Sequence, residues 1–130
     1  MGVFQVSCEV RDVRSRRRPV VVRGLLVDTG SEFSWLPTSQ LRSAGVRIEK
    51  KDIPFVMANG QRVTRATGYA ILRVGDFETV DEVVFAQPGD LSLLGARTLE
   101  GFGASVDARG RRLQTRDRRT QERATGSDRR

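Results

Sequence analysis

The sequence predicts an all-β fold, a barrel or a sandwich, with one or two short helices. Its apolar residues fall into many short runs that are separated by turn residues. One of these turns is Asn59-Gly60, and an Asn-Gly pair between two extended runs is the strongest short-range signal of a hairpin, because both residues tolerate a positive φ. Closely spaced short strands with such turns between them are typical of barrels and sandwiches.

The first strands are expected on either side of an arginine-rich loop. Residues 3–10 include alternating apolar positions, as in a half-buried strand. Arginines 14, 16, 17 and 18 then form the loop of a hairpin, and the aliphatic residues 20–22 and 25–27, interrupted by Gly24, lead to Asp28-Thr29-Gly30. Residues 35–37 are a further extended piece, because the residue before a proline is pushed out of the helical region.

The rest of the chain is expected to alternate strands with two short helices. Thr38 or Ser39 is expected to cap the first helix, and Gly45 is expected to end it. The other predicted elements are a hairpin of residues 53–57 and 61–67, strands at 69–74 and 79–86, a helix at 97–102, and a closing hairpin of 104–107 and 111–113.

Length and charge predict one domain with a basic tail. The chain has 130 residues, 23 basic and 16 acidic, and a formal net charge of +7. From Asp107 onward there are nine arginines against four acidic residues, and almost no apolar residue follows Leu113. Such a segment cannot bury enough surface to offset the entropy of ordering it. We therefore expect a folded domain at residues 1–113 and a disordered arginine-rich tail at residues 114–130.

The composition excludes several kinds of chemistry. The chain has no histidine and a single cysteine, Cys8. Nucleophilic catalysis with an imidazole base, zinc sites built from Cys and His, and an intrachain disulfide are therefore excluded. We expect Cys8 to be a small core residue, and we expect neither a metal site nor a cofactor.

The arginines allow two interpretations, contact with a polyanion or simple solvation. No aromatic residues are interleaved with them and no nucleic-acid-binding motif is present, so the solvated loop and tail are favoured and a nucleic acid partner is not expected. No apolar stretch approaches the ~20 residues that cross a bilayer. The N-terminal residues lack the pattern of a signal peptide. A soluble cytoplasmic protein without a membrane partner is the expectation.

The most informative stretch is Leu25-Leu26-Val27-Asp28-Thr29-Gly30-Ser31. A carboxylate directly after a buried strand is costly unless it is hydrogen-bonded or functional. On its own, Asp28-Thr29-Gly30 could be a turn that ends a strand. Two later features accompany it in order: the hairpin with Asn59-Gly60 at its tip, and Leu93-Leu94-Gly95 before a short helix.

From roughly Val3 to Leu113, this order resembles the retropepsin-like aspartic proteases, in particular the small single-domain bacterial proteins. The resemblance implies a dimeric acid-protease barrel that hydrolyses peptide bonds. Asp28, Thr29 and Gly30 would be the catalytic loop, with Thr29 bracing the loop of the partner. The reaction needs two carboxylates, one that acts as base on a water and one that is protonated and polarises the carbonyl. Because the chain has one Asp-Thr-Gly, the resemblance implies a homodimer.

The resemblance also implies a set of residues that bind a peptide or protein substrate. Ser31 would place its hydroxyl near the Asp28 carboxylate, and Trp35 would line a subsite or else pack in the core. The hairpin tip, Asn59-Gly60-Gln61, would close over the peptide as a flap. Leu94 is expected at the substrate site as well.

Two departures from the family pattern bear on the dimer and the flap. Ala96 stands where retroviral enzymes commonly have an arginine, although Glu32 and Arg97 could form a related pair. The flap tip also has fewer glycines than the viral pattern. The alternative function is a catalytically silent dimer of the same fold that acts as a peptide- or polyanion-binding module.

Overall fold

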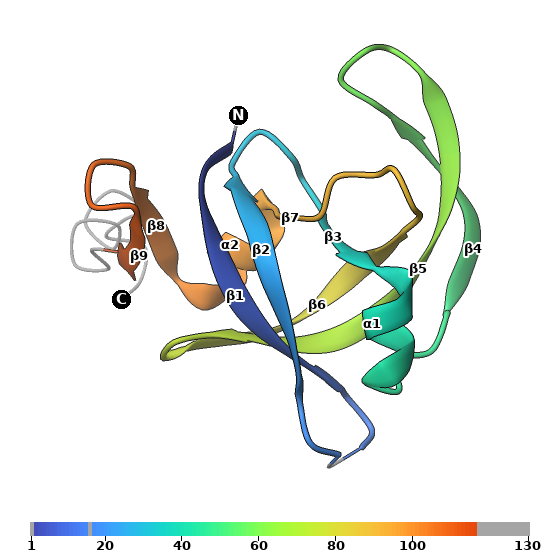
Figure 1. Cartoon of the computed structure of the whole chain (residues 1–130), viewed down its shortest axis with the longest axis horizontal. Coiled ribbons are helices and arrows are strands. Elements are labelled where there is room, and N and C mark those ends of the chain that lie inside the picture. The colour runs from blue at the N-terminus through green and yellow to red at the C-terminus, as the bar shows by residue number, and fades with distance from the viewer. Residues whose placement is uncertain (1, 16, 117–130) are drawn as a thin grey trace, which may run out of the picture.

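The computed structural model describes residues 2–15 and 17–116, and within them it is mostly β-sheet (Figure 1). A seven-stranded sheet has the order β1-β2-β7-β3-β6-β5-β4. An additional pairing of β1 with β5 closes all of these strands except β4 into a ring. The all-β prediction is confirmed. The elements are β1 (Gly2–Asp12), β2 (Val20–Asp28), β3 (Ser34–Pro37), α1 (Thr38–Ser43), β4 (Lys50–Val56), β5 (Arg62–Val74), β6 (Phe77–Ala86), β7 (Leu93–Leu94), α2 (Ala96–Phe102), β8 (Ala104–Asp107) and β9 (Arg112–Thr115).

The hairpin of β1 and β2 carries the arginine-rich loop, as predicted, and β2 is one continuous strand. Val6 pairs with Leu25 but Cys8 pairs with Val22, so β2 has one residue more than β1 over this stretch. Gly24 lies in this bulge with a φ of +71°. Glycine adopts that conformation without steric cost, which is why it bends the strand without ending it.

Strand β5 is also longer than expected, because the predicted strands at 61–67 and 69–74 are one strand. Gly68 joins the two parts. A β-carbon there would lie 2.2 Å from the carbonyl oxygen of Arg47 and 3.1 Å from the ring of Phe85. The missing side chain therefore lets another segment cross close to the strand, and the ladder to β6 continues through Gly68 and Val83.

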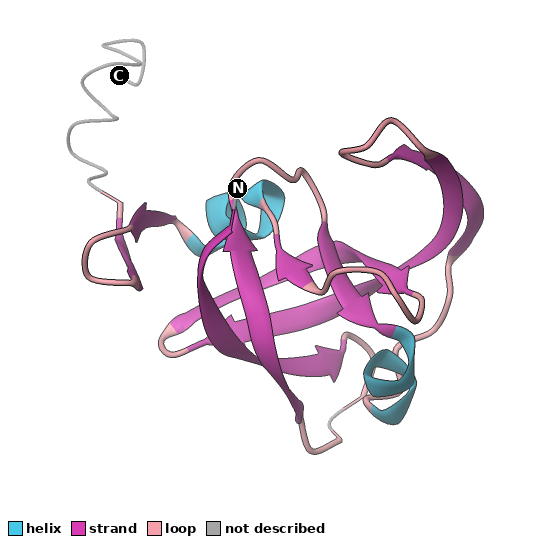
Figure 2. Cartoon of the chain, turned by 45° about the horizontal axis from the view of Figure 1, so that its top comes forward, coloured by secondary structure: helices cyan, strands magenta, loops and turns pink. Residues whose placement is uncertain are grey.

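Both short helices are present, and they lie on separate sides of the barrel (Figure 2). The predicted cap of the first helix is wrong. The residue before α1 is Pro37, which makes no side-chain cap, and the Thr38 hydroxyl instead donates to the carbonyl of Ala86 at 2.7 Å. The second helix ends at Gly103 with a φ of +69°, in the left-handed conformation that commonly terminates helices.

The buried side chains form two clusters. The larger fills the barrel and includes Cys8, which is fully buried as predicted, and burial raises the pKa of its thiol to about 12. The smaller cluster contains Trp35, Val84, Ala86 and Leu93, with Phe55 packed against it. This second cluster lies where β4 meets the barrel.

Strands β8 and β9 form a separate two-stranded sheet at one side of the barrel (Figure 1). β9 runs to Thr115, so the domain boundary predicted after Leu113 falls inside this strand. Most of the predicted tail, residues 117–130, lies outside the described residues. No helix in the described part of the chain is long and apolar enough to cross a membrane.

Gly95, like Gly68, is required by close packing and not by its backbone conformation. Gly95 precedes α2 with a φ of −98°, which any residue can adopt. A β-carbon at this position would lie 2.4 Å from the carbonyl oxygen and 2.6 Å from the carbonyl carbon of Phe33. Any side chain here would push α2 away from the segment between β2 and β3.

We therefore expect Gly95→Ala to lower the free energy of unfolding by about 2–3 kcal/mol, as overpacking does. Gly60→Ala is the matched control, because no atom lies within 4 Å of its β-carbon and its φ of +86° leaves only backbone strain of about 1 kcal/mol. Urea unfolding of both variants measures the difference. A loss at Gly95 no larger than the loss at Gly60 would contradict the packing argument.

Candidate active site

Asp28 is the last residue of β2, and the chain turns sharply after it. The amide of Gly30 donates to Oδ1 of Asp28 at 2.9 Å, and the amide of Ser31 donates to the carbonyl oxygen of Asp28 at 3.2 Å. Asp28 is half-buried, while Thr29 and Gly30 are exposed. The turn thus presents the carboxylate and the two residues after it at the surface of the folded chain.

The loop after Asp28 is fixed by the segment that contains Leu93-Leu94-Gly95. Strand β7 pairs in parallel with the end of β2, through Leu26 with Leu93 and Val27 with Leu94. The amides of Ala96 and Arg97 donate to the carbonyls of Ser31 and Glu32 at 2.7 and 3.0 Å. The two sequence motifs are therefore parts of one structure.

A series of largely buried hydrogen bonds holds Gly95 and the start of α2 against β3 and β6. The amide of Gly95 donates to Oγ of Ser34 at 2.9 Å, and Oγ of Ser34 lies 2.6 Å from Oγ1 of Thr98. Thr98 gives its one hydroxyl proton to Oδ2 of Asp81 at 2.8 Å, so Ser34 is the donor to Thr98. Sequence analysis missed Ser34, Thr98 and Asp81, because nothing in one sequence marks such side chains as partners.

The ion pair suggested between Glu32 and Arg97 is not formed. These residues meet through the backbone, and the guanidinium of Arg97 lies over the ring of Phe33, 4.9 Å from its centre. A cation over an aromatic face is attracted by the ring and keeps one side in water. Glu32 is exposed beside it.

A cavity of about 570 Å³ lies next to Asp28. Its mostly apolar walls come from the loop after Asp28, from strand β4 and from the segment before β7. The lining residues are Asp28, Gly30, Ser31, Glu32, Phe33, Trp35, Ile53, Pro54, Phe55, Val56, Met57, Ala58, Leu91 and Leu93. The structure thus brings together four of the predicted site residues, namely Asp28, Gly30, Ser31 and Trp35.

Aromatic side chains join β4 to the floor of this cavity. The ring of Phe55 packs edge-on against Trp35, with 5.2 Å between centroids, and against Phe33, with 5.7 Å. Such edge-to-face pairs stabilise contacts beyond the area that they bury. Trp35, predicted to line a subsite or else to pack in the core, is 7% exposed in the smaller cluster and also lines the cavity.

Of the predicted residues Ser31 and Leu94, only Ser31 lines the cavity. Ser31 donates its hydroxyl proton to the carbonyl oxygen of Phe33 at 2.9 Å. Leu94 is fully buried in the main core, so its neighbour Leu93, not Leu94, reaches the cavity. Sequence analysis missed Phe33, Phe55 and Leu91 as lining residues, since only the folded chain brings them together.

The predicted flap tip, Asn59-Gly60-Gln61, is exposed and does not line the cavity. The amide of Gln61 donates to the side chain of Asn59 at 2.9 Å, and the amide of Gly60 donates to the carbonyl of Met57 at 2.8 Å. These bonds close the tip of the hairpin of β4 and β5, which lies at the upper right of Figure 1. We call residues 53–65 of β4, the tip and β5 the flap hairpin.

Two acidic residues of the same chain are candidates for a second acid, since Glu32 lines the cavity and Asp90 directly precedes the lining residue Leu91. Asp90 is engaged, because Arg65 binds both of its oxygens and this hydrogen bonding lowers the pKa of the Asp90 carboxyl. Glu32 remains beside the cavity. Within the described part of the chain, no three His, Cys, Asp or Glu side chains lie close enough together to hold a metal ion.

Comparison with known proteins agrees with this geometry. A family model described as aspartyl protease matches residues 7–98, well over half of the chain and inclusive of both motifs. None of the curated proteins matches the chain. The chain therefore belongs to the aspartyl protease family, as its resemblance to retropepsin-like proteins implied.

Proposed function

We propose that the protein is an aspartic endopeptidase whose pair of catalytic aspartates forms across a homodimer. The observation that carries the proposal is the single Asp28, held in a tight surface turn beside a large apolar cavity. Thr29 and Gly30 are exposed in the subunit, where a second copy can reach them. In the dimer, Thr29 hydrogen-bonds to the opposite loop and the two Asp28 carboxylates face each other.

The two carboxylates share one proton and take different roles in the reaction. The ionised member takes a proton from a water, which attacks the scissile carbonyl, and the protonated member donates a hydrogen bond to the carbonyl oxygen. The flap hairpin lies over the peptide and excludes bulk water from the reaction. The peptide runs extended along the cleft, as strands added to sheets do.

A catalytic pair made of Asp28 and a second acid from the same chain is the less favourable arrangement. Asp90 is bound by a guanidinium and its pKa is lowered, so it does not supply the proton that the second member must hold. Glu32 lines the cavity but is exposed, where water screens it from a partner charge. The Asp28 of a second copy would supply the second carboxylate without any movement of Asp90 or Glu32.

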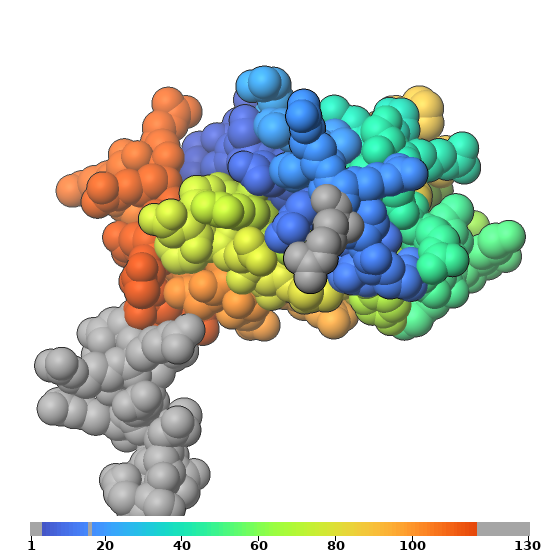
Figure 3. Space-filling model, turned by 90° about the horizontal axis from the view of Figure 1, so that it is seen from below, coloured from blue at the N-terminus to red at the C-terminus, as the bar shows by residue number. Residues whose placement is uncertain are grey.

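A second candidate function is polyanion binding, and one cavity favours it. A hollow of about 340 Å³ is lined by Arg11, Arg17, Arg18 and Arg73 together with Glu9 and Pro19. It lies at the arginine-rich loop, shown in blue in Figure 3. The length of β2 places it about 26 Å from Asp28 at ~3.3 Å per residue. If a polyanion binds there, its affinity falls steeply with salt and does not depend on Asp28.

Asp28→Asn is expected to lower the rate of peptide hydrolysis by about 10³-fold, because an amide can neither take the proton from water nor share one. The fold should persist, since the amide group can still accept the bond from Gly30. Assays of kcat/KM on a peptide library, with circular dichroism as the control for folding, measure both. Cleavage at the wild-type rate by Asp28→Asn would show that another group is the base.

Dilution should lower the specific activity, because each subunit holds half of the site. Adding a ninefold excess of Asp28→Asn chains should reduce the wild-type rate to about a tenth. After random exchange, about a tenth of the wild-type chains are still paired with a wild-type chain, and the mixed dimers lack one of the two carboxylates. Asp76→Asn chains are the control, because Asp76 is exposed in the turn between β5 and β6 and does not line the cavity. In the same excess they should leave the rate undiminished. An active monomer in sedimentation, or a wild-type rate that survives proven chain exchange, would exclude the shared site.

A further inference from the structure

The outer part of the flap hairpin is not held by the barrel sheet. Strand β5 pairs with β6 from Thr67 to Val74. The residues of β5 before Thr67 pair with β4 alone. The hairpin therefore extends from the barrel over the cavity beside Asp28. Its position there depends on contacts other than strand pairing.

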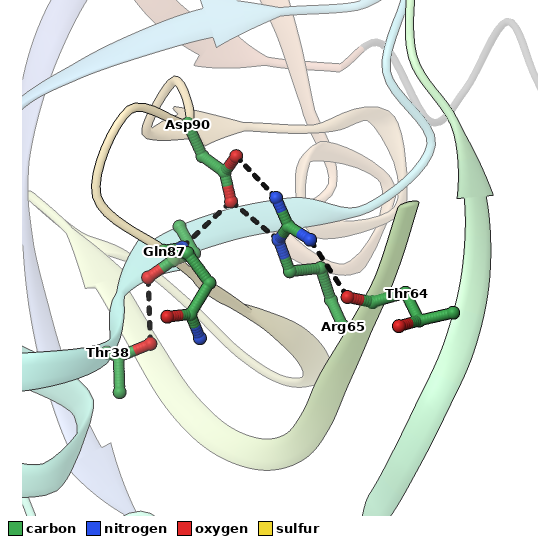
Figure 4. A network of polar contacts seen from close by, with 6 residues as sticks. Thr38, Thr64, Arg65, Gln87 and Asp90 are labelled. Atoms are coloured by element: carbon green, nitrogen blue, oxygen red, sulfur yellow. Dashed lines mark hydrogen bonds and ion pairs between the residues drawn. The ribbon is translucent and has the colours of Figure 1, made fainter. Parts of the chain in front are cut away.

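One such contact is an ion pair of Arg65 in β5 with Asp90 in the loop between β6 and β7 (Figure 4). Nε of Arg65 donates to Oδ2 of Asp90 at 2.7 Å, and Nη2 donates to Oδ1 at 2.8 Å. The two side chains are 16% and 9% exposed. A two-pronged, charge-assisted pair with so little exposure fixes both distance and angle and is weakly screened by salt.

The Asp90 side of this pair is rigid. Oδ2 of Asp90 also accepts the amide of Gln87 at 2.8 Å, and the amide of Asp90 donates to the carbonyl of Gln87 at 2.9 Å. The bond from Thr38 to the carbonyl of Ala86 anchors the start of the same loop to α1. Arg65 therefore connects the flap hairpin to a well-braced part of the barrel.

The same pair joins the two walls of the cavity. Arg65 lies opposite Ile53 in the β4–β5 ladder, and Ile53 lines the cavity. Asp90 directly precedes Leu91, which lines the cavity from the other side and is 65% exposed. The length of the ion pair thus sets the separation between these walls.

We infer that Arg65 and Asp90 are positioning residues that hold the flap hairpin over the cavity and set the width of the substrate site. The substrate part of this inference rests on the proposed function. Without the pair, the outer hairpin keeps its apolar contacts with the smaller cluster, to which Phe55, Met57 and Val63 contribute. These contacts lack the fixed distance and angle of the ion pair, so the hairpin moves away from the floor of the cavity.

Trp35 allows a test that needs no catalysis. It is the single tryptophan, it lines the cavity and it contacts Phe55 of the flap hairpin. We expect Asp90→Asn and Arg65→Gln to raise the acrylamide quenching constant of its fluorescence at least about twofold. Asp107→Asn is the matched control, because Asp107 also accepts from an arginine, Arg112 at 3.0 Å, and from a backbone amide, but on the separate β8–β9 sheet.

Peptide hydrolysis then tests the effect on substrate. Asp90→Asn and Arg65→Gln should increase the KM for the peptide about tenfold and change kcat less than threefold, whereas Asp107→Asn should change neither. A merely structural loss would lower the amount of active enzyme and leave KM unchanged. Folded variants with unchanged quenching would overturn the inference, and increased quenching with unchanged KM would overturn its substrate part. If the wild type has no Asp28-dependent cleavage, the proposed function fails, while the quenching result still decides whether the pair holds the hairpin.

Discussion

The close approach of Gly95 to the segment after Asp28 is the contact on which the site depends. The first amides of α2 donate to the carbonyls of Ser31 and Glu32, and β7 pairs with the end of β2. These bonds are possible only because Gly95 has no side chain to strike Phe33. The buried bonds from Gly95 through Ser34 and Thr98 to Asp81 then connect the loop with β6. The backbone that carries Asp28 is thereby fixed by three strands and a helix.

Much of the fold could be predicted from the sequence, because runs of apolar residues and turn signals are local properties. Asn59-Gly60 marked the hairpin of β4 and β5, and α2 lies where the second helix was expected, at 96–102 against the predicted 97–102. Besides the cap of α1, the predictions that failed are at glycines inside strands. Gly24 and Gly68 look like breaks, but one lies in a bulge and the other admits a crossing segment. Whether a glycine ends a strand or serves its packing depends on partners that are distant in sequence.

The turn at Asp28 could be predicted in part from the sequence, and the cavity beside it could not. Asp28 follows an apolar strand, a pattern that is visible locally. Leu93 and Leu94 are consecutive in a strand, so one faces the core and the other the cavity, and the sequence alone does not say which. The cavity walls require Phe33, Phe55 and Leu91 to meet from three separate segments. Arg97 packs over the ring of Phe33 and does not pair with the carboxylate of Glu32. This contact, too, depends on how the folded chain places the three side chains.

The chain has one Asp-Thr-Gly, whereas peptide hydrolysis by this route requires two carboxylates that share a proton. Thr29 and Gly30 lie exposed beside it, and the candidate acid Asp90 is occupied by Arg65. The most direct measurement is a crystal structure of the protein as it assembles in solution. If the site is shared, two Asp28 carboxylates will lie about 3 Å apart across a two-fold axis, within hydrogen-bonding distance. A dimer that buries another surface and leaves the two Asp28 residues far apart would contradict the shared site.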